Sequence, residues 1–227
     1  MGKSSELVIF DLFETILDKE WFDYGKVLEY LHGKYFAGFS RADVDNWASD
    51  YRSLRMADRN ETGRESGFID QLKYYEERSG TRYPDDYDII ERDVFPVCRG
   101  ERVGNHVPEA LEHLKSRGHP LAILSNSIFS SGCLIGYLES FGLSKYFDRV
   151  FSSADLGVRK PFPSAFHQVC GVFGADPKET WFVGNNKEKD VKGAANAGLK
   201  AVYYDRVGDG YDGYCVSDLK ELKEIIR

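Results

Sequence analysis

The most informative stretch of this chain lies near its start and reads Leu7-Val8-Ile9-Phe10-Asp11-Leu12-Phe13-Glu14-Thr15. Its first four residues form a short apolar run, which is typical of a buried strand in a parallel sheet. The run ends abruptly at Asp11. Because ligands bind at the carboxyl ends of strands in open α/β sheets, this position predicts that Asp11 is a nucleophile, a metal ligand or both.

The length and charge of the chain narrow its possible functions. Its 227 residues allow one large domain, or a core domain with a smaller insertion, and its formal net charge is −7. Nucleic-acid binding needs clustered Lys and Arg, so the acidic balance predicts no nucleic-acid partner. No apolar run approaches the ~20 residues that a membrane helix needs, and we therefore expect no membrane partner. The sequence does not indicate an oligomeric state.

The cysteines and the N-terminal residues predict the compartment. Cys98, Cys133, Cys170 and Cys215 are widely spaced with no C-x-x-C pair, which is typical of reduced thiols rather than of disulfides or a zinc site. The N-terminal stretch is polar and leads directly into the first predicted strand, unlike a signal peptide. We therefore expect a cytoplasmic protein.

From about residue 100 onwards, the sequence alternates between helical and strand-like patterns. The repeated βα order predicts a parallel sheet covered by helices on both sides, which is a Rossmann-like, doubly wound α/β core. The predicted strands are 121–124, 150–151, 181–183 and 201–204, and the predicted helices are 108–117, 161–173, 187–197 and 217–225, the last with Ser217 as its N-cap. Residues 208–213 match G-x-G-x-x-G, but an apolar edge strand at 214–216 follows them instead of a helix, so they predict a loop.

Residues 19–98 have a different pattern, rich in aromatic and charged residues with helical spacing. We predict that 19–98 forms a small helical cap domain, inserted into an α/β core made of 1–18 and 99–227, with linkers near residues 18 and 100. The two apolar stripes of the predicted cap are Leu28, Leu31 and Tyr35, and Phe68, Leu72 and Tyr75.

Polar residues gather where the elements of the predicted core begin or end. They are Asp11 and Thr15 after the first strand, Ser125 and Asn126 after the second, Lys160 before a helix, and Asn185 and Asp190 after strand 181–183. Since the carboxyl ends of parallel strands share one edge of the sheet, we expect these side chains to lie close together.

These motifs, in this order, resemble those of the haloacid dehalogenase-like hydrolase superfamily. The family's first motif is D-x-D-x-T, here residues 11–15, and its second is a Ser or Thr after an apolar strand, here Ser125. The third is a Lys often followed by Pro, here Lys160-Pro161, and the fourth is G-D-S-x-x-x-D before an alanine-rich helix and a glycine, here 184–198. The resemblance covers nearly the whole chain, and the predicted cap lies where the family's helical cap sits.

The resemblance implies a role for each motif. Asp11 would be the nucleophile that attacks phosphorus, or carbon in the dehalogenases, and forms an intermediate that water then cleaves. Thr15 would orient the Asp11 loop, Ser125 would donate a hydrogen bond to the transferring group, and Lys160 would neutralise negative charge. In the family's phosphatases a Mg²⁺ ion would bind the residues at four positions, here Asp11, the backbone carbonyl of Phe13, Asn185 and Asp190.

Substrate ligands are predicted from the core and from the cap. In the core they are Ser125 and Asn126. In the cap, Arg52, Arg55 and Arg59 share a helical face. A clamp on a small anionic substrate is one interpretation of this face, and an exposed charged surface is the other.

Two residues depart from the phosphatase pattern of the family. Phe13 stands at the usual place of a second aspartate and cannot act as an acid or a base, a contribution typically worth ~10²–10⁴-fold. The family's dehalogenases also have an aromatic residue there. Asn185 replaces the first aspartate of the fourth motif, so we expect weaker Mg²⁺ binding, although its separation from Asp190 matches the phosphatases. Glu14 stands where the family often has glycine, and we expect its side chain to point away from Asp11.

Three functions remain open on this basis. The first is a Mg²⁺-dependent phosphatase acting on a small phosphorylated metabolite, with the cap closing over the substrate. The second is a 2-haloacid dehalogenase that uses the same aspartate on carbon without a metal. The third is a catalytically weak protein that binds a ligand or a partner, for which Phe13 and Asn185 are the main support. The presence of Asp11, Ser125, Lys160 and Asp190 together favours an enzyme.

Overall fold

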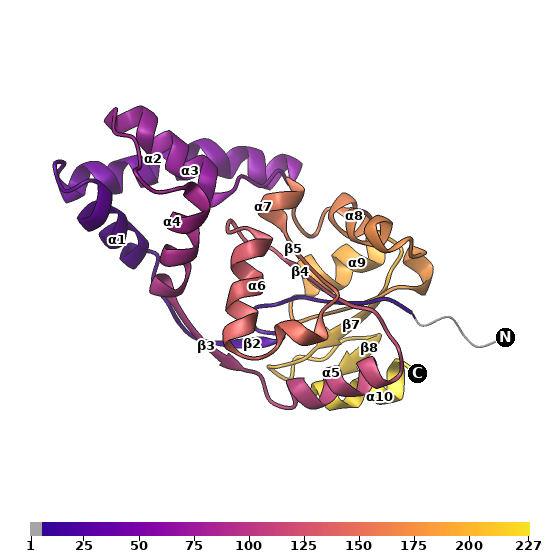
Figure 1. Cartoon of the computed structure of the whole chain (residues 1–227). Coiled ribbons are helices and arrows are strands. Elements are labelled where there is room, and N and C mark those ends of the chain that lie inside the picture. The colour runs from indigo at the N-terminus through magenta and orange to yellow at the C-terminus, as the bar shows by residue number, and fades with distance from the viewer. Residues whose placement is uncertain (1–5) are drawn as a thin grey trace.

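Six parallel strands form the sheet of the α/β core (Figure 1). The computed structural model describes residues 6–227, apart from the side chains of residues 57 and 58, so the first five residues of the predicted segment 1–18 lie outside the described residues. In sheet order the strands are β5 (Arg149–Ser152), β4 (Leu121–Ser125), β1 (Val8–Phe10), β6 (Trp181–Gly184), β7 (Lys200–Tyr204) and β8 (Tyr214–Val216).

The alternation of side chains along β1 explains how the sheet is covered. Successive side chains of a strand point to opposite faces. Val8 and Phe10 belong to one apolar cluster, together with side chains of the helices α5 (Val107–Ser116), α6 (Ser131–Ser140) and α10 (Leu222–Ile225). Leu7 and Ile9 belong to the other, with α8 (Pro163–Phe173) and α9 (Gly193–Asn196). Helices therefore cover both faces, which confirms the predicted doubly wound fold.

Several predicted element boundaries needed correction. The segment predicted as one helix over 187–197 is a π-helix, η4 (Lys187–Lys192), followed by α9. The C-terminal segment is a 3₁₀ turn followed by α10, and Asp218 rather than Ser217 caps it, because the Asp218 side chain accepts from Lys220 N. The remaining short elements are α7 (Ser153–Leu156) and the 3₁₀ turns Phe95–Cys98, Ser144–Tyr146, Pro177–Glu179 and Leu219–Glu221.

Four helices form a separate cluster at one end of the molecule (Figure 1). They are α1 (Gly25–Tyr35), α2 (Arg41–Thr62), α3 (Phe68–Ser79) and α4 (Tyr87–Val94). Their centre is aromatic: the Phe36 ring lies 5.5 Å from that of Trp47 and 6.2 Å from that of Tyr75 between centroids. Ser40 starts α2 with a capping box that includes Asp43. This cluster is the helical cap of the fold.

The segments that join the cap to the core are strands, where the sequence predicted linkers. β2 (Leu17–Phe22) pairs antiparallel with β3 (Arg99–Val103), from Leu17 opposite Val103 to Phe22 opposite Arg99. Two paired strands therefore carry the cap. Within the described residues no helix is long and apolar enough to cross a membrane, and the four cysteines are free thiols.

Candidate active site

The order of the strands brings the first and fourth motifs together at one edge of the sheet. β1 lies between β4 and β6, with Phe10 level with Ile123 on one side and Val183 on the other. The chain continues to β4 on one side of β1 and returns to β6 on the other, which makes this edge a topological switch point. Asp11 follows β1 directly, and its backbone N–H donates to the carbonyl of Val183 at 2.9 Å.

A buried lysine links the two carboxylates of the site. Lys160 Nζ lies 2.6 Å from Asp11 Oδ1 and 2.7 Å from Asp190 Oδ1. Lys160 is 1% exposed and Asp190 is 2% exposed. Lys160 is 149 positions from Asp11 and 30 positions from Asp190 in the sequence, yet the three residues form one ion-paired group.

The hydroxyl of Thr15 lies beside the same aspartate. Its Oγ1 donates to Asp11 Oδ2 at 3.2 Å and lies 3.4 Å from Asn185 Oδ1. In the loop from Asp11 to Thr15, Glu14 adopts a left-handed backbone with φ of 65°, a conformation that favours glycine. The Glu14 carboxylate accepts from Lys19 N and pairs with Arg206, so it is not directed at Asp11.

The second motif holds the third in place. The Asn126 side-chain amide makes two hydrogen bonds of 2.9 Å to the main chain of Lys160, accepting from its N–H and donating to its carbonyl. Ser125 is 1% exposed, and its hydroxyl has no hydrogen-bond partner in the described part of the chain. A buried hydroxyl without a partner is available to a ligand.

The fourth motif depends on a glycine and on the π-helix. A Cβ at Gly184 would lie 2.6 Å from the side chain of Asp190, so this close approach excludes any larger residue. Asp190 lies within η4, and its Oδ2 accepts from Asn186 N at 2.9 Å. The Asn186 side chain accepts from the N–H groups of residues 188 and 189 and so caps η4. π-Helical turns often occur at functional sites.

Burial and ion pairing act in opposite directions on the pKa values of this group. Burial raises the pKa of Asp11 from 3.8 to about 6, against the opposing charge of Lys160 and with a further contribution from Asp190. Burial alone would lower the pKa of Lys160, but the two carboxylates outweigh it and raise that pKa. At neutral pH the site therefore holds a charged lysine and an ionised Asp11.

The oxygen atoms near Thr15 suit a hard cation that is held by few charges. Asp11 Oδ2 and Asn185 Oδ1 both lie near the Thr15 hydroxyl. Across residues 6–227, no group of three or more His, Cys, Asp or Glu side chains is placed to hold a metal. The Asn185 amide and the Phe13 carbonyl would therefore have to supply neutral oxygen ligands beside the two carboxylates, a donor set that still fits Mg²⁺.

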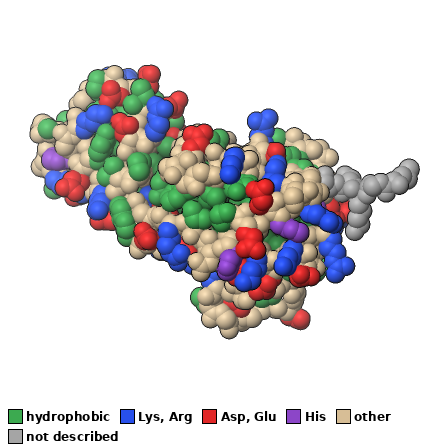
Figure 2. Space-filling model, turned by 60° about the horizontal axis from the view of Figure 1, so that its bottom comes forward, with side chains coloured by type: hydrophobic (Ala, Val, Ile, Leu, Met, Phe, Trp, Pro, Cys, Tyr) green, Lys and Arg blue, Asp and Glu red, His purple; other side chains and the backbone are tan. Residues whose placement is uncertain are grey.

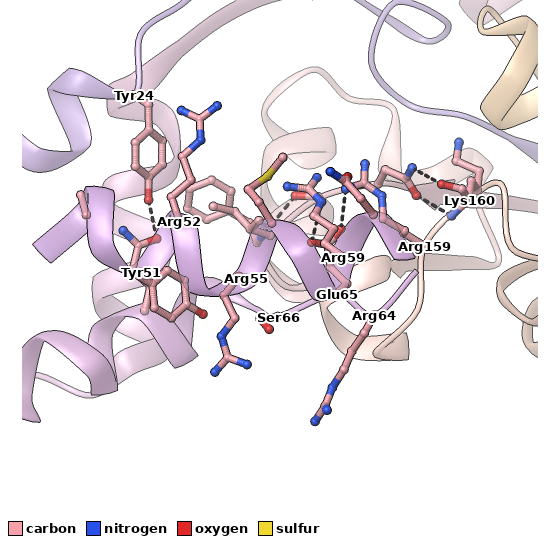
Figure 3. A pocket seen from close by; sticks show the side chains of 18 of the residues that line it. Tyr24, Tyr51, Arg52, Arg55, Arg59, Arg64, Glu65, Ser66, Arg159 and Lys160 are labelled. Carbon is pink, nitrogen blue, oxygen red and sulfur yellow. Dashed lines mark hydrogen bonds and ion pairs between the residues drawn. The ribbon is translucent and has the colours of Figure 1, made fainter. Parts of the chain in front are cut away.

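A cavity of about 930 Å³ lies between the cap and this edge of the sheet, and basic side chains surround it. The basic residues lining it are Arg52, Arg55, Arg59, Arg64, Arg99, Arg159, Lys160 and Lys189, and the acidic residues among its described lining are Asp45 and Glu65. Figure 3 shows Arg52 and Arg55 extending from α2 in opposite directions, so they do not converge as a pair.

A second contact between cap and core adjoins Lys160. Arg159 N donates to the Gly63 carbonyl at 3.0 Å, and Glu65 N donates to the Gly157 carbonyl at 3.1 Å. The buried Glu65 carboxylate accepts from Ser153 Oγ at 3.0 Å and lies 3.4 Å from Arg59 and 3.7 Å from Arg159, as Figure 3 shows for the two arginines. We call residues 63–65 with 157–159 the cap latch.

Sequence reasoning missed the cap latch and Arg99, which also lines the cavity. Residues 157–159 directly precede Lys160 of the third motif, but residues 63–65 and Arg99 belong to no motif and to no apolar stripe. Glu65 and Arg159 meet across 94 positions of sequence only because the cap folds back on the core. For Arg99, the signal that the sequence offered is a basic residue directly after the predicted cap segment.

The comparisons with known proteins establish the family. The family model of the haloacid dehalogenase-like hydrolases matches residues 6–198. The chain therefore belongs to the haloacid dehalogenase-like hydrolases.

Individual relatives include enzymes of two kinds. A phosphoserine phosphatase from Thermus thermophilus is 36% identical over 125 residues, which are 52% of this chain and 49% of that protein. An (S)-2-haloacid dehalogenase 4A from Burkholderia cepacia is 36% identical over 101 residues, which are 44% of this chain and 42% of that protein. The chain thus spans about half the length of the curated relatives it matches. A solved 2-haloacid dehalogenase from Pseudomonas syringae has a TM-score of 0.67 at 19% identity over 98% of both chains, which shows a common fold.

Proposed function

We propose that this chain is a phosphomonoester hydrolase that uses Asp11 as its nucleophile on a small phosphorylated metabolite. The observation that carries the proposal is the buried group of Asp11, Lys160 and Asp190 at the switch point of the sheet, beneath a cavity lined by basic side chains. An ionised carboxylate beside positive charge suits attack on an anionic substrate. The phosphoserine phosphatase relative supports the same reaction class.

The proposed reaction has two steps. An oxygen of the Asp11 carboxylate attacks phosphorus, the bond between phosphorus and the leaving oxygen breaks, and an acyl phosphate forms. Water then attacks this phosphorus, inorganic phosphate leaves, and the carboxylate is restored. Lys160 stabilises the charge on the transferring group, the Ser125 hydroxyl donates to it, and Thr15 fixes the Asp11 carboxylate. Because Phe13 carries no proton, the leaving alkoxide takes its proton from water.

The remaining predicted residues support these steps. Asn126 acts on the substrate through Lys160, whose main chain it holds. Arg52 and Arg55 remain predicted substrate ligands at the rim of the cavity. We also propose that Asp11, the Phe13 carbonyl, Asn185 and Asp190 bind Mg²⁺. When bound, the ion would add positive charge next to the phosphoryl oxygens.

The cap is proposed to exclude bulk water from the reaction. We propose the boundaries 19–98 for the cap and 1–18 with 99–227 for the core, since all four cap helices fall within the first range. On the face in Figure 2, Lys and Arg are interspersed with Asp and Glu, which supports a small-molecule substrate rather than nucleic acid. The free thiols support a cytoplasmic location.

A 2-haloacid dehalogenase is the second candidate, because Phe13 fits that branch and a dehalogenase is among the relatives. Here Asp11 would attack carbon, the carbon–halogen bond would break and release halide, and water would cleave the resulting ester.

Turnover assays distinguish the two candidates. We would measure phosphate release from an aryl phosphate with Mg²⁺ and with chelator, and halide release from 2-chloropropionate, using Asp11→Asn as the blank. Mg²⁺-dependent phosphate release that Asp11→Asn abolishes is expected. Halide release without phosphate release would replace the first candidate by the second. If neither phosphate nor halide is released, the result favours the third function, a catalytically weak binding protein.

A further inference from the structure

The guanidinium of Arg99 is buried between cap and core without the polar partners that a buried charge normally has. Arg99 begins β3, opposite Phe22 of β2, and its side chain is 10% exposed. Its Nε and Nη1 have no hydrogen-bond partner among the residues that the structure describes. Buried polar groups in folded proteins are nearly always paired, and charged groups most of all, so this deficit requires an explanation.

The neighbours of Arg99 fix its position without satisfying its N–H groups. The guanidinium carbon lies 4.3 Å from the ring centroid of Phe95 and 4.4 Å from that of Phe13, which are cation–π contacts. Glu101 Oε1 lies 3.9 Å from Arg99 Nε, beyond hydrogen-bond distance, and Glu101 Oε2 accepts from the Tyr137 hydroxyl. A rigid guanidinium therefore retains N–H donors for a further acceptor.

Arg99 lines the cavity that adjoins the proposed reacting centre. It lines the same cavity as Phe13 and Lys160, and Lys160 contacts Asp11. Phe13 is two residues from Asp11, and two residues span at most about 7 Å of chain. The Phe13 ring also touches the guanidinium, and Arg99 and Lys160 line one cavity, so a substrate in that cavity can contact both basic groups.

We propose that Arg99 binds a carboxylate of the substrate and thereby selects phosphomonoesters that carry a carboxylate. This inference rests on the proposed function. The N–H groups of a guanidinium match carboxylate oxygens, and exclusion of water strengthens such hydrogen bonds. The carboxylate of Glu101 nearby opposes a second, doubly charged phosphate, so a singly charged group fits better. The phosphoryl end of the substrate then lies at Asp11 and Lys160.

Calorimetric binding tests the proposal independently of turnover. The probes are phosphoglycolate, which carries a carboxylate, and ethyl phosphate, which does not, both titrated into protein with Asp11→Asn. We expect about 10- to 100-fold tighter binding of phosphoglycolate, the range for a hydrogen bond to a charged group. Adding Arg99→Gln removes this preference while ethyl phosphate binding stays, and Arg99→Lys restores part of it.

Arg102→Gln is the matched control. Arg102 lies on the same strand, pairs with Asp18 at 2.7 Å, and is 53% exposed in its side chain. It should keep the preference for phosphoglycolate. The proposal is overturned if the parent protein shows no preference, if Arg99→Gln keeps it, or if Arg99→Gln weakens both probes equally. Failure of the proposed function would instead appear as absent phosphate release by the wild-type protein, with the Arg99-dependent preference intact.

Discussion

Replacing Asp11 by asparagine should abolish activity and yet stabilise the fold as the pH rises. The side chain of Asp11 is buried, and its ionised form is disfavoured there even with Lys160 at 2.6 Å. The amide of asparagine has nearly the same shape and carries no charge at any pH. The variant therefore removes the free-energy cost of keeping an ionised carboxylate buried in the folded state.

The size of the effect follows from the pKa of Asp11. Burial raises this pKa from 3.8 to about 6, and each pKa unit corresponds to about 1.36 kcal/mol, so the whole shift corresponds to about 3 kcal/mol. Since the pKa is raised in the folded state, protonated Asp11 supports the fold fully below about pH 4, and this support is lost as the pH rises through about 6. Asp11→Asn has no such proton to lose. Its free energy of unfolding, relative to wild type, should increase by about 3 kcal/mol between about pH 4 and 7.

Urea unfolding of the wild type and Asp11→Asn across this pH range measures the difference directly. Subtracting the two curves cancels the titration of groups that both proteins share. Asp50→Asn, an exposed change on α2, controls for the loss of one surface carboxylate and should stay within about 0.5 kcal/mol of wild type throughout. A difference for Asp11→Asn that is flat with pH, or that falls as the pH rises, would refute the reasoning.

Three further substitutions test other parts of the site. Lys160→Met should lose about 3–5 kcal/mol of stability at pH 7, because it leaves Asp11 and Asp190 buried without their counter-charge; urea unfolding measures this, and a loss below about 1 kcal/mol would contradict it. Phe13→Asp should raise kcat on alkyl phosphates by about 10²-fold or more, with a smaller gain on aryl phosphates, whose leaving groups need no acid; equal gains in steady-state kinetics would count against the role assigned to position 13. Gly184→Ala should displace Asp190, because the added Cβ would lie 2.6 Å from its side chain, and so lower kcat; unchanged kcat would show that the close approach is not required.

The parts of the fold that could be predicted from the sequence are those that local pattern controls. Short apolar runs that end in polar residues identify buried parallel strands, and β1 and β4 begin within one residue of the predicted positions. The stripe of Phe68, Leu72 and Tyr75 is fully buried in the cap, as its helical spacing predicts. The edge strand at 214–216 was also predicted correctly.

The parts that could not be predicted depend on partners far away in the sequence. β2 has only its first two residues buried, so it lacks the alternation that marks a strand, and it is held by pairing with β3. The π-helix places Asp190 against Gly184 and beside Lys160. No propensity of residues 187–192 predicts this helix type. The cap latch has no sequence pattern because its two halves meet only after the cap has folded.

The cap latch connects the position of the cap to the proposed active site through the main chain next to Lys160. Arg159 N donates to the Gly63 carbonyl, and Arg159 directly precedes Lys160. Opening the cap breaks this bond and frees the backbone one residue from the ammonium group that holds Asp11 and Asp190 together. The Lys160 main chain is then held by its two hydrogen bonds to the Asn126 side chain, while its ammonium group keeps its contacts to Asp11 and Asp190. Opening of the cap for substrate entry would thus be coupled, through the peptide unit between Arg159 and Lys160, to the position of the lysine that pairs with the proposed nucleophile.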